Sequence, residues 1–133
     1  MIQRIKYPDN KNAKSIFEAS IRQMNYTLKL ESNDDSAFNI IRNIYECFRM
    51  LGDSLLISEG QISDEHVEQI KVLEKLNVKL ERPIQLVDNL RRMRHNINYY
   101  GFSPKKIDSD DAISFAKLCF FKIAKVVSKE IKD

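Results

Sequence analysis

Glycine and proline are scarce in this chain, and their scarcity narrows its possible folds more than any other feature. Three glycines and three prolines among 133 residues are too few for an all-β fold, which needs many tight turns. Apolar residues instead recur three and four positions apart, the spacing that lines one face of an α-helix. The sequence therefore predicts an all-α protein.

Five segments carry this helical spacing, and the connections between them are short. The first begins after Asp9, and the Ser, Asn and Asp residues at positions 32–35 then break it and offer helix caps. We expect the second helix to be long and to end at Gly60. A shorter third helix is expected to begin at Ser63 or Asp64.

The fourth and fifth helices have their own boundary signals. Pro83 suits the first position of the fourth helix, which runs to Tyr100 and is stopped by Gly101 with a proline soon after. The run Asp108-x-x-Asp111 resembles a capping box, with Asp in place of Glu, and opens the fifth helix. Because short loops favour antiparallel neighbours, the expected architecture is an up-and-down bundle of four or five helices.

The composition is that of an ordinary globular protein, with 43% hydrophobic and 31% charged residues. Residues 1–133 are therefore expected to form a single helical-bundle domain. The net charge of +3 is compatible with a nucleic-acid partner but does not establish one. The N-terminus lacks an apolar signal-peptide core and no apolar run approaches ~20 residues, so we expect a cytoplasmic protein without membrane association.

Motifs of the best-defined metal and nucleotide sites are missing from the sequence. Cys47 and Cys119 lie far apart, without a C-x-x-C, and the chain has two histidines, so neither zinc nor any other cofactor is expected. A pair of buried, unpaired thiols fits a reducing cytosol. The sequence also lacks G-x-x-x-x-G-K, G-x-G-x-x-G, G-x-S-x-G and H-E-x-x-H.

The run LRRMRHNINYYG at positions 90–101 interrupts the apolar pattern with charged and polar residues. Arg94 shares one helical stripe with Val87, Leu90 and Ile97, the residues expected to face the core. Such an inward cation must be satisfied, because burying it unpaired is costly. It is either a structural arginine, which snorkels to solvent or pairs with a carboxylate, or an anion-binding one, for which phosphate is the commonest match.

Spacing on the fourth helix decides which of these side chains could act together. Arg94 and Asn98 are four residues apart, as are His95 and Tyr99, so each pair shares a face. Together they could hold a phosphodiester, with arginine stabilising the developing negative charge and histidine moving a proton. No metal is needed if a ribose 2′-hydroxyl is the nucleophile.

Other charged residues have plainer interpretations. Arg91 and Arg92 suit the negative end of the helix dipole, while His66 is expected on the surface. Glu46 and Asp53 are expected to form structural pairs with arginines. A lysine stripe on the last helix could track phosphates, although a solvated helix face is the favoured interpretation. Its members are Lys122, Lys125, Lys129 and Lys132.

Two stretches resemble the HEPN superfamily, the small helical-bundle domains of prokaryotic toxin–antitoxin and defence systems. Residues 90–101 resemble its late-helix run, an arginine followed by a polar residue, a small or apolar one, then Asp or Asn with Tyr or His. Residues 44–60 resemble its long second helix, which ends in a leucine run and Glu-Gly or Lys-Gly. The order of the helices agrees over nearly the whole chain.

The resemblance implies a four- or five-helix bundle that forms a homodimer, with the motif helices meeting at a cleft. Many members are metal-independent ribonucleases whose motif is an arginine, four to six residues, then a histidine. Others are non-catalytic and bind nucleotides or RNA, or partner a small nucleotidyltransferase.

Carried over to this chain, Arg94 matches the motif arginine and His95 the polar residue after it. Tyr99 stands where the motif histidine should begin to appear, and counting back from His95 to Arg91 leaves one residue too few. A tyrosine with a pKa near 10 is a poor general base at pH 7. Either His95 has taken over proton transfer or the site binds without cleaving, and Arg94, His95 and Tyr99 are the candidate catalytic residues.

Arg91, Asn98 and Tyr100 are the candidate binding residues beside them. In some members of the superfamily the partner enzyme nucleotidylates a motif tyrosine, and Tyr99 and Tyr100 lie near that position but out of its register. Three functions stay open: a nucleotide- or RNA-binding partner of a nucleotidyltransferase, an endoribonuclease, and a bare interaction protein. The missing histidine favours the first over the second, and the inward arginine disfavours the third.

Overall fold

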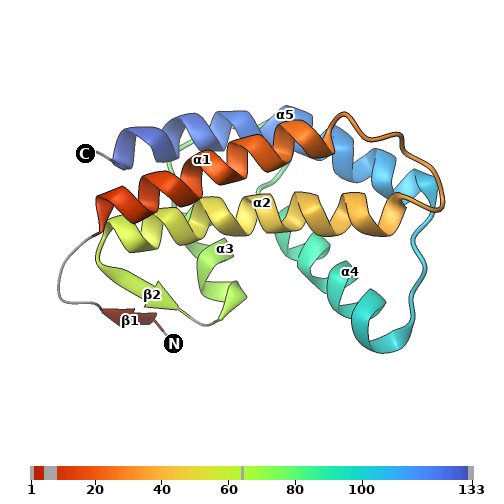
Figure 1. The fold of residues 1–133 in the computed structure, drawn as a ribbon, viewed down its shortest axis with the longest axis horizontal. Coiled ribbons are helices and arrows are strands. Elements are labelled where there is room, and N and C mark those ends of the chain that lie inside the picture. Colours follow the sequence, from red (N-terminus) through yellow and green to blue (C-terminus); the bar gives the residue numbers. More distant parts are fainter. Residues whose placement is uncertain (1, 5–8, 64, 132–133) are drawn as a thin grey trace.

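A computed structural model describes residues 2–4, 9–63 and 65–131 as a helical bundle (Figure 1), which confirms the predicted fold class. None of the helices in these residues is long and apolar enough to cross a membrane. The elements are β1 (Ile2–Arg4), α1 (Asn10–Thr27), α2 (Ala37–Ser58), β2 (Gln61–Ser63), α3 (His66–Glu74), α4 (Leu86–Tyr100) and α5 (Lys106–Glu130).

The three long helices α1, α2 and α5 lie side by side, with α3 and α4 on the other side of α2 (Figure 1). Helices α1 and α2 are antiparallel, and α5 runs in the same direction as α2. The two shorter helices, α3 and α4, connect the end of α2 to the start of α5. The bundle is therefore up-and-down, with two short helices in place of a third long one. Helix α4 slants away from α2 and its C-terminal end projects from the bundle.

The core is built around α2, whose predicted apolar stripe is buried along its whole length. Phe48 stacks on Phe115 of α5 with 5.2 Å between ring centroids and meets Phe120 edge-on at 5.3 Å. All three rings are at most 2% exposed. Burying a side chain of this size contributes roughly 1.5–3 kcal/mol, so these aromatic contacts are a main source of the bundle's stability.

Several helix boundaries follow the sequence signals. The Asp9 carboxylate accepts a hydrogen bond from the Asn12 amide at 3.0 Å and caps α1. Gly60 follows α2 with φ 76° and Gly101 follows α4 with φ 68°, the left-handed conformation that glycine adopts without strain. These ends were predicted because a cap acts within one turn of its helix.

The predicted starts of α3 and α4 are wrong. Ser63 belongs to β2, where it pairs antiparallel with Ile2, and α3 begins at His66; Asp64 lies outside the described residues. Helix α4 begins at Leu86, whose amide donates to the Pro83 carbonyl at 3.1 Å in a turn that precedes the helix. The first error arises because a strand pair joins segments far apart in sequence, which a local pattern cannot indicate.

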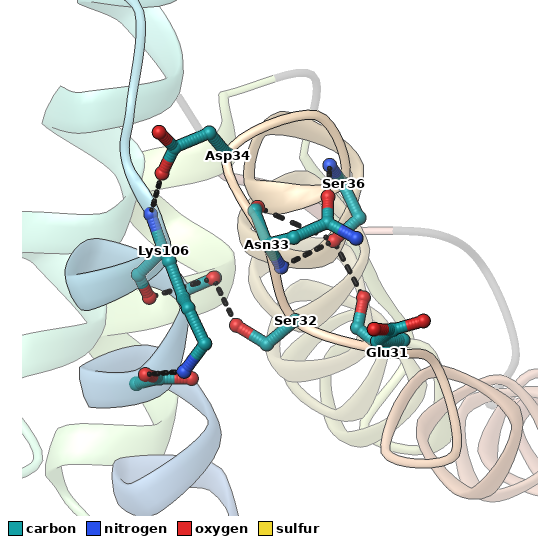
Figure 2. A network of polar contacts seen from close by, with 8 residues as sticks. Glu31, Ser32, Asn33, Asp34, Ser36 and Lys106 are labelled. Atoms are coloured by element: carbon teal, nitrogen blue, oxygen red, sulfur yellow. Dashed lines mark hydrogen bonds and ion pairs between the residues drawn. The ribbon is translucent and has the colours of Figure 1, made fainter.

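The loop between α1 and α2 caps the start of α5, although the two segments lie far apart in the sequence (Figure 2). The Asp34 carboxylate accepts from the Lys106 amide at 2.7 Å, and the Ser32 and Ser109 hydroxyls are 2.6 Å apart. Asn33 holds the loop in shape, since its side-chain oxygen accepts from the Ser36 amide at 2.8 Å. The loop thus ties the first half of the bundle to its last helix.

Asp108 does not open α5 as predicted. It lies in the first turn and its carboxylate accepts from the Lys105 amide at 2.8 Å, as the acid of a capping box does. Asp111 pairs instead with Arg82 at 3.2 Å. The predicted start was late because the residue that caps the first amide of α5 comes from the α1–α2 loop.

Candidate functional site

A close approach of α2 and α3 sets up the site. A Cβ added at Gly52 of α2 would lie 1.8 Å from the backbone oxygen of Gln69 on α3. Since no side chain fits in that space, glycine is required for α3 to lie directly on α2. This contact brings His66, in the first turn of α3, against the polar side chains of α2.

Tyr45 and His66 form the centre of the site. The Tyr45 ring is fully buried, and its hydroxyl shares a hydrogen bond of 3.0 Å with Nδ1 of His66. Burial raises the pKa of Tyr45 to about 12, so the phenol stays protonated. His66, predicted on the surface, is instead half-buried, and burial together with the Arg49 charge lowers its pKa below 6.5. A neutral imidazole, able to accept a proton, is therefore the favoured form near pH 7.

Arg49 is fully engaged by its neighbours. Its Nε donates to Glu46 at 3.0 Å and its Nη1 donates to the Gln69 side-chain oxygen at 3.2 Å. The Gln69 amide nitrogen in turn donates to Asp53 at 3.2 Å. The expected pairing of Glu46 with an arginine is confirmed, whereas Asp53 is held by a glutamine.

Arg94 faces the core side of α4, as its stripe predicts, but it is poorly satisfied there. Its Nε is buried and has no hydrogen-bond partner among the described residues. The nearest carboxylate oxygen, from Glu46, is 3.9 Å away, beyond hydrogen-bond distance. The guanidinium carbon lies 5.7 Å from the centroid of the Tyr45 ring. The side chain keeps 30% of its surface exposed, so a ligand can reach its other atoms although the Nε itself is buried.

Three arginines surround the Tyr45–His66 pair. The charges of Arg49, Arg91 and Arg94 each lower the pKa of both Tyr45 and His66, and the charge of Glu46 acts in the opposite direction. We call Arg49, Arg91 and Arg94 the arginine cluster. Arg49 and Arg91 each have a carboxylate within hydrogen-bond distance, so Arg94 is the member of the cluster best suited to an anion that brings its own negative charge.

Arg91 is also tied to a carboxylate on its own helix. Its Nε lies 2.8 Å from Asp88, which Arg92 approaches at 3.0 Å from the other oxygen. Both arginines line a groove of about 420 Å³ between α3 and α4. A second depression of about 320 Å³, farther along α4, is lined by the same two arginines with His95 and Asn96. The helix thus offers ligand-accessible surface on both sides of its arginines.

The structure separates the three candidate catalytic residues. Arg94 contacts α2, whereas His95 and Tyr99 are exposed, with 4.6 Å between their ring centroids. Tyr100 is 76% exposed, 5.8 Å from His95, and Asn98 also faces solvent. Successive helix residues point about 100° apart, so Arg94 cannot share a face with His95. That these two act on one phosphodiester stays a prediction.

The histidine beside Arg94 is His66, which the sequence interpretation left on the surface. Both residues contact Tyr45, one through its ring and the other through its hydroxyl. One signal could have pointed to this region. Tyr45, Arg49 and Asp53 recur every four residues and form a polar ridge beside the apolar stripe of α2.

The described residues offer no site for a metal ion or for thiol chemistry. No group of three or more His, Cys, Asp or Glu side chains there could hold a metal ion. Cys47 and Cys119 are buried and free, and burial raises the pKa of Cys47 to about 12, so this thiol is unreactive at neutral pH. The lysines at 122, 125 and 129 are exposed, as a solvated helix face requires, and Lys132 lies outside the described residues.

Comparison with protein-family models, with curated proteins and with solved structures gave no match to this chain. The resemblance to HEPN domains therefore rests on the two sequence stretches and on the order of the helices.

Proposed function

We propose that this protein is a HEPN-like module that binds the phosphate groups of RNA or of a nucleotide at the arginine cluster. The observation that carries the proposal is the buried Nε of Arg94, which has no hydrogen-bond partner among the described residues. An unsatisfied buried donor destabilises a fold by roughly 1–3 kcal/mol, and an anion that binds the exposed part of the side chain and draws the guanidinium toward solvent would relieve that penalty. The Nε of Arg94 is therefore a donor without an acceptor among the described residues.

Arg49 also approaches Glu46 and has the hydrogen bonds expected of a structural arginine. It makes two hydrogen bonds, at 3.0 and 3.2 Å, and it already takes the nearer oxygen of Glu46. Arg94 is left with the 3.9 Å approach to the other oxygen. The difference between these neighbouring guanidinium groups supports a ligand-binding role for Arg94.

Phosphate is the anion that fits the cluster best. A guanidinium presents parallel donors that match two phosphate oxygens, and the Tyr45 ring beside Arg94 favours one orientation of that fork. The net charge of +3 adds long-range attraction for a polyanion. Partnership with a small nucleotidyltransferase and homodimer formation are part of the proposal, and both rest on the HEPN resemblance.

A metal-independent endoribonuclease is the second candidate, favoured by the neutral His66 beside the cluster. In this hypothesis His66 accepts the proton of a ribose 2′-hydroxyl, whose oxygen attacks the adjacent phosphorus. The bond from phosphorus to the 5′-oxygen breaks, the 5′-oxygen takes up a proton, and a 2′,3′-cyclic phosphate forms. Arg94 would stabilise the negative charge on phosphorus, the role assigned to it from the sequence, while His66 replaces His95 and Tyr99.

The test measures binding and cleavage of a labelled single-stranded RNA in EDTA, and separately the binding of ATP, with Arg94→Met and Arg42→Met side by side. Arg42 is a matched control, since it is exposed on α2 and its guanidinium also lies over a ring, 5.5 Å from Phe38. We expect Arg94→Met to weaken binding by about tenfold or more, the value of a charge-assisted hydrogen bond, and Arg42→Met to bind like the native protein.

The outcomes separate the candidates. Binding without cleavage supports the binding module, and cleavage that is lost in His66→Gln supports the ribonuclease. If the native protein binds neither RNA nor ATP, or if both arginine variants bind equally well, the arginine cluster is not a phosphate site and the proposal fails.

A further inference from the structure

The end of α4 carries exposed aromatic rings that the arginine cluster does not use. Tyr99 is 72% exposed, Tyr100 76% and Phe102 43%, and His95 stands beside both tyrosines. We call these four residues the aromatic surface. We infer that they stack against the unpaired bases of a single-stranded nucleic acid, an inference that rests on the proposed function and names its substrate class.

The rings are arranged around His95 on the outside of the helix. Its imidazole lies 4.6 Å from the Tyr99 ring at 39° and 5.8 Å from the Tyr100 ring at 63°. The helix end that holds them projects away from α2 (Figure 1), so none of these side chains contributes to the core. These rings lie too close to one another for a base to enter between them, but a base can stack on their exposed faces without any rearrangement of the bundle.

Arginine side chains connect the aromatic surface with the rest of α4. Arg92 lines one depression with His95 and another with Phe102, and its side chain is 69% exposed. It can therefore reach a phosphate that joins two stacked nucleotides. Arg91 lines the first depression and also belongs to the arginine cluster, so a strand could pass from one face of the helix to the other.

The charge around the rings indicates a polyanion. Residues 89–107 contain five lysines and arginines and no aspartate or glutamate, and Asp88, just before this stretch, is shared by two of them, Arg91 and Arg92. The other side chains of this stretch include Asn89, Asn96 and Asn98, whose amides can bond base edges. Rings interleaved with cations are the combination that binds single strands of nucleic acid.

Single-stranded substrate follows from the geometry of stacking. In a duplex the faces of the bases are covered by their neighbours, so exposed rings on a helix end cannot reach them. The aromatic surface should therefore distinguish a single strand from a hairpin of the same length. Simple phosphate attraction would bind both.

The experiment measures fluorescence anisotropy with a fluorescein-labelled oligouridine of about 12 nucleotides and with an RNA hairpin of equal length. The double variant Tyr99→Ala, Tyr100→Ala is compared with the native protein. Tyr26→Ala is the control, because Tyr26 is 59% exposed on α1, far along the chain from the aromatic surface. We expect the double variant to raise the Kd for oligouridine about 10- to 100-fold, with hairpin binding and the control unchanged.

A conservative variant and the oligomeric state complete the test. Tyr99→Phe, Tyr100→Phe keeps the rings and should bind oligouridine like the native protein. If the double alanine variant binds oligouridine as tightly as the native protein while Arg94→Met binds it weakly, stacking is refuted and the phosphate site stands. If the alanine variant instead converts a native dimer to monomers with unchanged RNA affinity, the surface joins two copies of this chain and the inference is wrong. If the native protein binds no RNA, the inference and the RNA part of the proposed function fail together.

Discussion

Replacing Arg94 by methionine should change the free energy of unfolding by less than about 1 kcal/mol, although the residue faces the core. The 3.9 Å ion pair with Glu46 joins side chains that are 30% and 33% exposed, so solvent screens it and its loss costs at most about 1 kcal/mol. The contact with the Tyr45 ring contributes about 0.5–1 kcal/mol. Against these losses, removing a buried donor without a partner returns roughly 1–2 kcal/mol.

Methionine keeps the unbranched stem of arginine and its packing, which makes it a better test than alanine. The matched comparison is Arg49→Met, which breaks hydrogen bonds of 3.0 Å to Glu46 and 3.2 Å to Gln69. That variant should lose roughly 2–4 kcal/mol.

Urea unfolding followed by far-UV circular dichroism measures both variants against the native protein. The reasoning is refuted if Arg94→Met loses about 3 kcal/mol or more, or as much as Arg49→Met. Arg94 would then be a structural arginine in a buried pair, and the proposed phosphate site would lose its main support.

Three further changes test how the fold holds the site. Gly52→Ala places a Cβ 1.8 Å from a backbone oxygen of α3, so a loss of at least about 2 kcal/mol in urea unfolding should outweigh the better helix propensity of alanine. Asp34→Ala removes the acceptor of the first α5 amide and should cost about 1 kcal/mol, seen as a lower melting temperature, while the exposed neighbour in Asp35→Ala should not. The lowered pKa of His66 means that the unfolded chain binds its proton more readily, so this residue should make stability fall as pH drops below 6.5; His66→Gln should flatten that dependence in urea midpoints.

Most of the fold could be predicted because apolar periodicity is a local property. The buried faces of α1, α2 and α5 follow the spacing of their apolar residues, and Gly101 ends α4 as expected. The errors lie where a contact with a segment far away in the sequence sets the start of a helix. Pairing of Ile2 with Ser63 moves the start of α3, and Asp34, from a loop some seventy residues earlier, caps α5.

The site was predicted in part, for the same reason. The stripe of α4 places Arg94 inward, and this was correct because it depends on one helix only. His66 was placed on the surface because a short polar helix gives little indication of what it packs against. Its position depends on Gly52, where the missing side chain lets α3 rest on α2.

The polar ridge of α2 is the strongest argument that this region serves a function. Tyr45, Arg49 and Asp53 occupy positions that apolar residues would fill at no desolvation penalty, and buried ion pairs seldom stabilise a fold more than such residues do. A ridge kept only for stability would satisfy every arginine that faces it, as it does Arg49. Here the Nε of Arg94 has no hydrogen bond among the described residues, and the neutral His66 contacts the same tyrosine, Tyr45. This arrangement is the one expected of an anion-binding site.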